Sequence, residues 1–178
     1  MAQRDWLDPL DTSFAQRVGG RWNPANSWAT LYLSRDLDTA RAQIARLLER
    51  SPVAPDDLAD DAYDLIAVTL PAARVTDVVD IVSAEGVAGA NLPATFPRDA
   101  TGHVIPHATC QRIAQRAHDQ GADGIEAKSA LAAISPPATS ELAWWPGSHR
   151  ATQVGGRVPY GQWRSRSVSD PSSLFPPI

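Results

Sequence analysis

Short apolar runs alternate along this chain with two longer segments of helical periodicity, and this alternation limits the fold more than any other feature. Five runs are β-prone, at residues 30–34, 63–70, 75–82, 124–129 and 141–145. Residues 36–50 and 109–120 instead repeat apolar side chains three and four positions apart, which is typical of a helix with one buried face. The sequence therefore predicts a mixed α/β or α+β domain.

Proline and glycine interrupt the segments between these elements, and the chain of 178 residues contains 15 prolines. Residues 1–30, residues 51–62 and most of residues 83–108 lack a clear period and are expected to be loops or extended chain. The C-terminal part of the chain is rich in glycine, proline, serine and arginine. We expect residues 1–147 to form the domain and residues 148–178 to be a C-terminal extension that is extended or partly disordered.

The charge and the cysteine content exclude several classes of protein. The net charge is −4 at pH 7, whereas a nucleic-acid-binding protein normally has a basic surface, so no direct contact with nucleic acid is expected. No stretch approaches the roughly 20 apolar residues that span a membrane, and the first residues lack the apolar core of a signal peptide. The single cysteine, Cys110, cannot form an internal disulfide. These features predict a cytoplasmic protein.

Three polar side chains could form a binding site, although each also has an ordinary structural explanation. Arg21 follows Gly19 and Gly20. It is either an exposed side chain beside a tight turn or a clamp for an anion, because a guanidinium matches a phosphate. Tyr32 is either a core residue with its hydroxyl hydrogen-bonded or a platform for a flat heterocycle. Ser129 ends a predicted strand and is either a turn residue or a polar contact for a ligand.

A metal site is the weakest candidate. His103, His107 and Cys110 have spacings that superficially suit metal ligands. However, Pro106 argues against one helix that presents both histidines, and no second cluster completes four ligands. We therefore expect no metal, and we expect Cys110 to be a packed thiol in the core.

Several of these segments, taken together, resemble the RES domain family, which is named for an arginine, a glutamate and a serine. The most specific segment is residues 19–24, Gly-Gly-Arg-Trp-Asn-Pro. It is followed, in the same order and spacing as in the family, by Thr-Leu-Tyr-Leu-Ser at residues 30–34 and by Gly-Ala-Asp-Gly-Ile at residues 121–125 with Ser129. The resemblance covers roughly residues 6–147. It implies an ADP-ribosyltransferase-like fold, with small β-sheets around an NAD⁺ cleft and helices that flank them.

The resemblance also implies an activity and a partner. RES domains are typically toxins of toxin–antitoxin pairs that cleave NAD⁺ at the nicotinamide–ribose bond, by hydrolysis or phosphorolysis. Some transfer ADP-ribose to a protein instead, and the antitoxin usually plugs the active site. In this chain Arg21 would hold the pyrophosphate or ribose side of NAD⁺, Tyr32 would stack on nicotinamide, and Ser129 would hydrogen-bond near the scissile bond. Fixed groups that stabilise the positive charge growing on the ribose would lower the barrier.

The glutamate of the family would fall eleven residues after Tyr32, and this position is Gln43. Glutamine keeps an acceptor but loses the charge, and the loss of one such stabiliser commonly costs about 10²–10³ in rate. The chain is accordingly a variant with weak or altered activity, a module that only binds NAD⁺ or an antitoxin, or a deliberately substituted toxin. Activity restored by Gln43→Glu would favour an enzyme. Glu126, close to Ser129, is a candidate replacement, whereas Glu49 is not, because six residues rotate a helix by about 240°.

Overall fold

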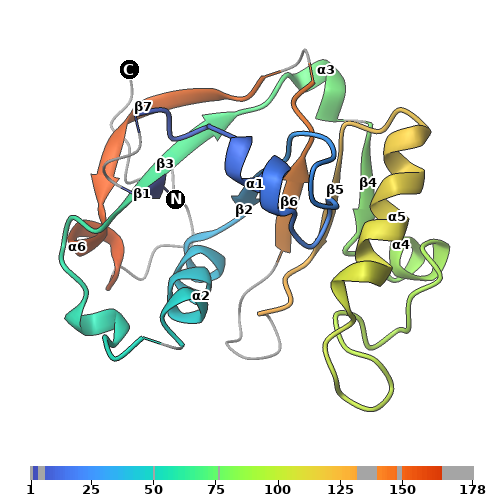
Figure 1. The fold of residues 1–178 in the computed structure, drawn as a ribbon, viewed down its shortest axis with the longest axis horizontal. Coiled ribbons are helices and arrows are strands. Elements are labelled where there is room, and N and C mark those ends of the chain that lie inside the picture. Colours follow the sequence, from blue (N-terminus) through green and yellow to red (C-terminus); the bar gives the residue numbers. More distant parts are fainter. Residues whose placement is uncertain are drawn as a thin grey trace.

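Two β-sheets form the framework of the chain (Figure 1). The computed structural model describes residues 2–3, 7–49, 51–75, 77–131, 140–147 and 150–165. The larger sheet has four strands, in the order β2 (Leu31–Ser34), β6 (Ser140–Trp144), β5 (Gly124–Lys128) and β4 (Val78–Ile81). The smaller sheet has three strands, in the order β1 (Ala2–Gln3), β3 (Tyr63–Thr69) and β7 (Thr152–Pro159).

The register of the larger sheet fixes which side chains share a face. β6 pairs antiparallel with both of its neighbours, while β4 and β5 run parallel. Tyr32 lies opposite Ala143, and Glu141 lies opposite Ser34 on one side and Ala127 on the other. Because paired residues point to the same face and alternate residues share a face, these side chains lie together on one surface of the sheet.

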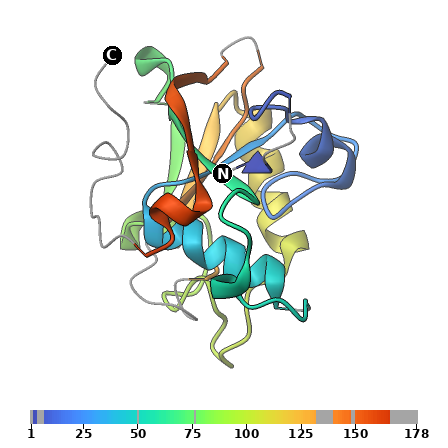
Figure 2. The same ribbon diagram turned by 90° about the vertical axis from the view of Figure 1, so that its left-hand side faces the viewer.

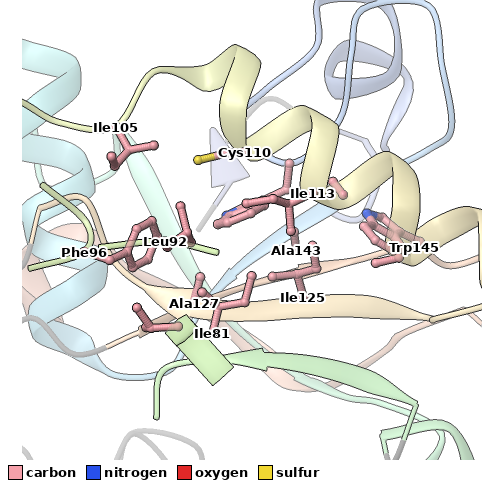
Figure 3. Close-up of a cluster of buried hydrophobic side chains, with 14 residues drawn as sticks. Ile81, Leu92, Phe96, Ile105, Cys110, Ile113, Ile125, Ala127, Ala143 and Trp145 are labelled. Atoms are coloured by element: carbon pink, nitrogen blue, oxygen red, sulfur yellow. The ribbon is translucent and has the colours of Figure 1, made fainter. Parts of the chain in front are cut away.

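Helix α5 (His107–Asp119) covers that surface of the larger sheet. Its buried stripe is formed by Cys110, Ile113, Ala114 and Ala117. Figure 3 shows Cys110 and Ile113 facing Ile125, Ala127 and Ala143 on the strands below. The predicted amphipathic helix over residues 109–120 is therefore present and begins two residues earlier, directly after Pro106. A proline disfavours the helical conformation in the residue before it, so the helix does not extend further toward the N-terminus.

Helix α2 (Leu37–Leu48) joins the two sheets at their lower ends in Figure 1 and lies beside α6 (Tyr160–Trp163) in Figure 2. It begins at Asp36, whose carboxylate accepts a hydrogen bond from Thr39 N at 2.7 Å. This is an N-cap, which satisfies a backbone N–H that the helix leaves unpaired. A second core cluster surrounds its buried face and comprises Leu37, Ala40, Ile44, Leu65, Val158, Tyr160 and Trp163.

Several short elements occupy segments that the sequence predicted to be loops. They are α1 (Ser13–Val18), the 3₁₀ turn η1 (Pro55–Asp57) and α4 (Ala84–Gly89), while α3 (Ala72–Val75) lies largely between two runs predicted to be β-prone. α1 has no buried residue and α4 has only Val87, so neither has an apolar stripe that could reveal it. The run at residues 75–82 also splits, because α3 ends at Val75 and β4 begins at Val78.

The chain beyond residue 147 contributes to the fold. Residues 152–159 form β7, which pairs antiparallel with β3, and α6 follows directly. Trp163 of α6 is fully buried in the second core cluster. The expected extension over residues 148–178 therefore includes a strand and a helical turn, and its residues 148–149 and 166–178 lie outside the described part of the chain.

Candidate functional site

A tight turn at residues 19–24 packs against the strand that carries Tyr32. Gly20 N donates to Asn23 O at 2.9 Å and closes the turn. The Tyr32 hydroxyl accepts a hydrogen bond from Trp22 N and donates one to Asn23 Oδ1, both at 2.8 Å. A Cβ atom on Gly20 would lie only 2.4 Å from the Tyr32 hydroxyl oxygen, so any larger residue would force the Tyr32 ring to move. Burial raises the pKa of Tyr32 above its usual value, which keeps the hydroxyl protonated as a donor.

Arg21 is buried at this turn and keeps unpaired hydrogen-bond donors. Its side chain is 7% exposed, and its Nε and Nη2 atoms have no hydrogen-bond partner among the described residues. The guanidinium carbon lies 5.5 Å from the ring centroid of Phe96 and 5.9 Å from that of Trp22. A buried cation with unpaired N–H groups is costly unless an anion or an acceptor binds there. The turn therefore presents a preformed site for an anionic group.

Glu141 places a buried carboxyl group beside this cation. It lies on the fully buried strand β6 and is 8% exposed. Gln43 Nε2 on α2 donates to Glu141 Oε2 at 3.3 Å. Burial raises the pKa of Glu141, and the charge of Arg21, the indole of Trp22 and the amide of Gln43 offset only part of that rise. Arg21, Tyr32 and Gln43, which the sequence singles out, thus surround an acidic residue that it does not.

Comparison with known proteins identifies the family. The family model of the RES domain matches residues 2–164. The chain belongs to the RES domain family. A search of curated proteins found no match. Among solved structures, a chain of the crystal structure of the M. tuberculosis MbcT–MbcA toxin–antitoxin complex is similar, with 17% sequence identity and a TM-score of 0.66 over 89% of this chain and 84% of that chain. The predicted mixed α/β RES fold is thereby confirmed.

Ser129 of this RES domain lies at the same end of the larger sheet. It directly follows β5, two residues beyond Ala127, which pairs with Glu141. The side chain is fully buried, and its hydroxyl accepts a hydrogen bond from Leu131 N at 3.2 Å. The structure therefore places Ser129 two residues along the chain from the strand partner of Glu141. The hydrogen bond from Leu131 N helps to orient the Ser129 hydroxyl.

Glu126, the sequence-based candidate for a replacement carboxylate, is engaged on the other face of the sheet. It lies opposite Leu142, one position away from the Glu141 face. Arg35 and Ser140 both donate to its carboxylate. Burial alone would raise the pKa of Glu126, but the hydrogen bonds from Arg35 and Ser140 outweigh it, and the pKa is lowered. Glu126 is therefore a structural ion-pair partner, and its choice as the replacement is wrong because strand alternation turns it away.

The signal for Glu141 was present in the sequence. Residues 140–144, Ser-Glu-Leu-Ala-Trp, form an apolar run with one acidic side chain, and all five are buried. A strand that is buried on both faces rarely contains a carboxylate unless that carboxylate has a partner or a function. The acidic residue within a predicted buried strand was therefore the clue to this part of the site.

His107 and Cys110 line the N-terminal turns of α5 near Arg21. Partial burial and then the charge of Arg21 lower the pKa of His107, which favours the neutral imidazole. Burial raises the pKa of the Cys110 thiol, so it is not activated as a nucleophile. Within the described ranges, no three His, Cys, Asp or Glu side chains are grouped to hold a metal ion. In the same ranges, no helix has the length and apolar character needed to cross a membrane.

A cavity of about 600 Å³ lies on the opposite face of β2 and β6, between the two sheets. Its lining includes Leu33 and Leu142, which alternate with Tyr32 and Glu141 along their strands, together with Leu65 of β3. The cavity lining does not include Arg21, Gln43 or Ser129. We place the candidate site of this RES domain at Arg21 and Glu141, because unpaired donors and a perturbed carboxyl mark chemistry better than the size of an apolar cavity.

Proposed function

We propose that this RES domain cleaves NAD⁺ at the nicotinamide–ribose bond, with water or phosphate as the acceptor. Membership of the RES family supports this activity, because the family is associated with NAD⁺ breakdown. The buried guanidinium of Arg21 supports it most directly, since its free Nε and Nη2 donors suit the pyrophosphate of a dinucleotide. Tyr32 and Ser129 would contact the nicotinamide and the ribose.

The proposed reaction needs charge stabilisation more than acid catalysis. The bond between ribose C1′ and the nicotinamide nitrogen breaks, and its electron pair neutralises the positively charged ring, so nicotinamide leaves as a neutral molecule. The ribose becomes oxocarbenium-like and carries positive charge until an oxygen of water or phosphate bonds to C1′ and gives up a proton. Fixed polar groups around the ribose would stabilise that charge in a water-poor site.

Nicotinamide release from NAD⁺ by the purified protein, followed by proton NMR with and without phosphate, tests this function. We expect release by the unmodified chain, with the phosphate dependence naming the acceptor. Arg21→Lys should lower the rate about 10²–10³-fold, because lysine keeps the charge but loses the forked donors. Arg35→Lys is the matched control and should retain the rate, since Arg35 pairs with Glu126 on the other face. Folded protein that binds NAD⁺ without releasing nicotinamide would instead favour a binding module.

We also propose that the chain is a cytoplasmic toxin with a cognate protein antitoxin. The fold similarity to a chain of the MbcT–MbcA toxin–antitoxin complex supports such a partner. An antitoxin that plugs the site would compete with the substrate for the donors of Arg21. We expect the protein encoded beside this chain to inhibit nicotinamide release when it is added in equal amount. Tight binding with an unchanged rate would contradict this arrangement.

A further inference from the structure

The candidate site contains a carboxyl group, that of Glu141, which lies on strand β6 of the larger sheet and not on helix α2. Glu141 shares its sheet face with Tyr32 through the register of β2 and β6. It is 8% exposed, in a strand whose other described side chains are apolar apart from Ser140. Burying a carboxylate costs free energy, and a protein keeps such a group when it is paired or has a function.

The partners of Glu141 do not form a closed ion pair. Arg21 acts on the carboxyl group through its charge, yet Arg21 Nε and Nη2 remain without a hydrogen-bond partner. The Glu141 side chain accepts a hydrogen bond from Gln43 Nε2 at 3.3 Å. A structural salt bridge would use these guanidinium donors in a forked arrangement with the carboxylate. The free donors of Arg21 and the buried carboxyl group of Glu141 instead leave a cation and an acidic group available to one ligand.

We propose that Glu141 supplies the negative charge of the NAD⁺ site, and that Gln43 on α2 positions it by donating to Oε2. The proposal rests on the proposed function and identifies a further residue for it. Glu141 opposes the positive charge that develops on the ribose and accepts a hydrogen bond from a ribose hydroxyl, while Arg21 holds the anionic part of the same molecule. The chain is accordingly a complete enzyme whose carboxylate lies on β6.

The hydrogen bond between Gln43 and Glu141 also explains why glutamine suits position 43. The amide N–H donates a hydrogen bond to the carboxyl group, which an ionised glutamate at position 43 could not do. Two carboxylates at this distance would repel each other, and one would take up a proton. Gln43→Glu is therefore expected to lower the activity, although the RES resemblance places a glutamate at position 43.

Three variants of the full chain test the proposal through the rate of nicotinamide release, with NAD⁺ binding measured by calorimetry as a second readout. Glu141→Gln should lower kcat about 10²–10³-fold and change KM much less, because the charge acts mainly in the transition state. Gln43→Glu should also lower kcat. The double variant Gln43→Glu/Glu141→Gln restores one carboxylate and one amide, and should recover at least tenfold over Glu141→Gln. Glu126→Gln is the matched control and should keep the unmodified rate.

The outcomes separate this proposal from the proposed function. Unmodified protein that releases nicotinamide at the same rate as Glu141→Gln overturns the role of Glu141 and leaves the function standing. A rate raised by Gln43→Glu alone also overturns it. Folded, unmodified protein that releases no nicotinamide overturns the function and the role of Glu141 together. Thermal unfolding of each variant checks that a lost rate is not lost folding.

Discussion

At the scale of single residues, the candidate site depends on two ionisable side chains that the fold keeps almost fully out of water. Arg21 and Glu141 are 7% and 8% exposed. Each costs free energy to bury, and their mutual attraction repays only part of that cost, because burial still raises the pKa of Glu141. The site is therefore expected to be less stable than an apolar core of equal size, which is common where charge serves binding.

The raised pKa of Glu141 predicts a pH-dependent stability. A carboxyl group whose pKa is higher in the folded state favours folding below its unfolded value of 4.5 and loses this contribution as pH rises through the folded value. The free energy of unfolding of the unmodified chain, minus that of Glu141→Gln, should therefore fall as pH rises above 4.5 and then level off. Urea unfolding of both proteins between pH 5 and 8 measures this difference through the unfolding midpoints.

Glu126→Gln serves as the control, because its stability difference should stay constant between pH 5 and 8 and should fall only below pH 4.5. The pKa of Glu126 is lowered, so its contribution to stability is present above the unfolded pKa and is lost as pH falls. A difference for Glu141→Gln that stays constant over the same range would contradict the buried, raised-pKa position of Glu141.

The close approach of Tyr32 to Gly20 predicts a second effect at this scale. In Gly20→Ala the new methyl group would meet the Tyr32 hydroxyl at 2.4 Å and displace it from Trp22 N and Asn23. We expect a loss of about 1–3 kcal/mol in the free energy of unfolding, as for overpacked cores. Gly156→Ala, where a Cβ atom would meet nothing within 4 Å, should change stability by less than about 0.5 kcal/mol. Equal losses in the two variants would contradict this reading of the turn.

At the scale of elements, the long helices were predicted correctly and the short ones were not. α2 and α5 have continuous buried stripes, and Asp36 caps the start of α2 as the sequence indicates. α4 has a capping serine, Ser83, whose hydroxyl accepts from Gly86 N at 3.0 Å, but it buries only Val87. A cap without an apolar stripe is a weak signal, because serine is equally common in turns.

The N-cap of α2 predicts an effect of Asp36 on the stability of the protein. The same cap supports the candidate site, because α2 carries Gln43. Asp36→Ala removes the hydrogen bonds to the N and Oγ1 atoms of Thr39 and should cost about 0.5–2 kcal/mol. Asp36→Asn keeps an acceptor at the same place and should recover most of that loss. Urea unfolding measures both variants. If Asp36→Asn is as unstable as Asp36→Ala, the charge of Asp36 matters more than its cap.

At the scale of the whole molecule, strands distant in the sequence complete both sheets. β7 pairs with β3 across more than eighty residues, and β6 lies between β2 and β5. Trp163 and Val158, from the end of the chain, pack with Ile44 of α2. Helix α2, which carries Gln43, is therefore stabilised both by its Asp36 cap and by packing against the C-terminal part of the fold.

Removal of the chain after residue 147 should consequently prevent folding. The shortened chain loses β7, α6 and the buried Trp163, and it exposes the apolar faces of α2 and β3. We expect no cooperative thermal unfolding, as measured by near-UV circular dichroism. A chain that ends at residue 165 is the control, since it retains every element described after residue 147. A cooperative transition in the shorter chain would contradict the role of β7 and α6.

The sequence by itself determined the local features of this protein: the helices with continuous stripes, the buried strands, the turn at residues 19–24 and the family. Each of these follows from residues close together in the chain, where spacing and side-chain type decide the outcome. Only the tertiary structure decided that Glu141, and not Glu126, faces Gln43, and that residues 152–163 belong to the fold. Strand register and long-range pairing decide these points, because a shift of one residue turns a side chain to the opposite face.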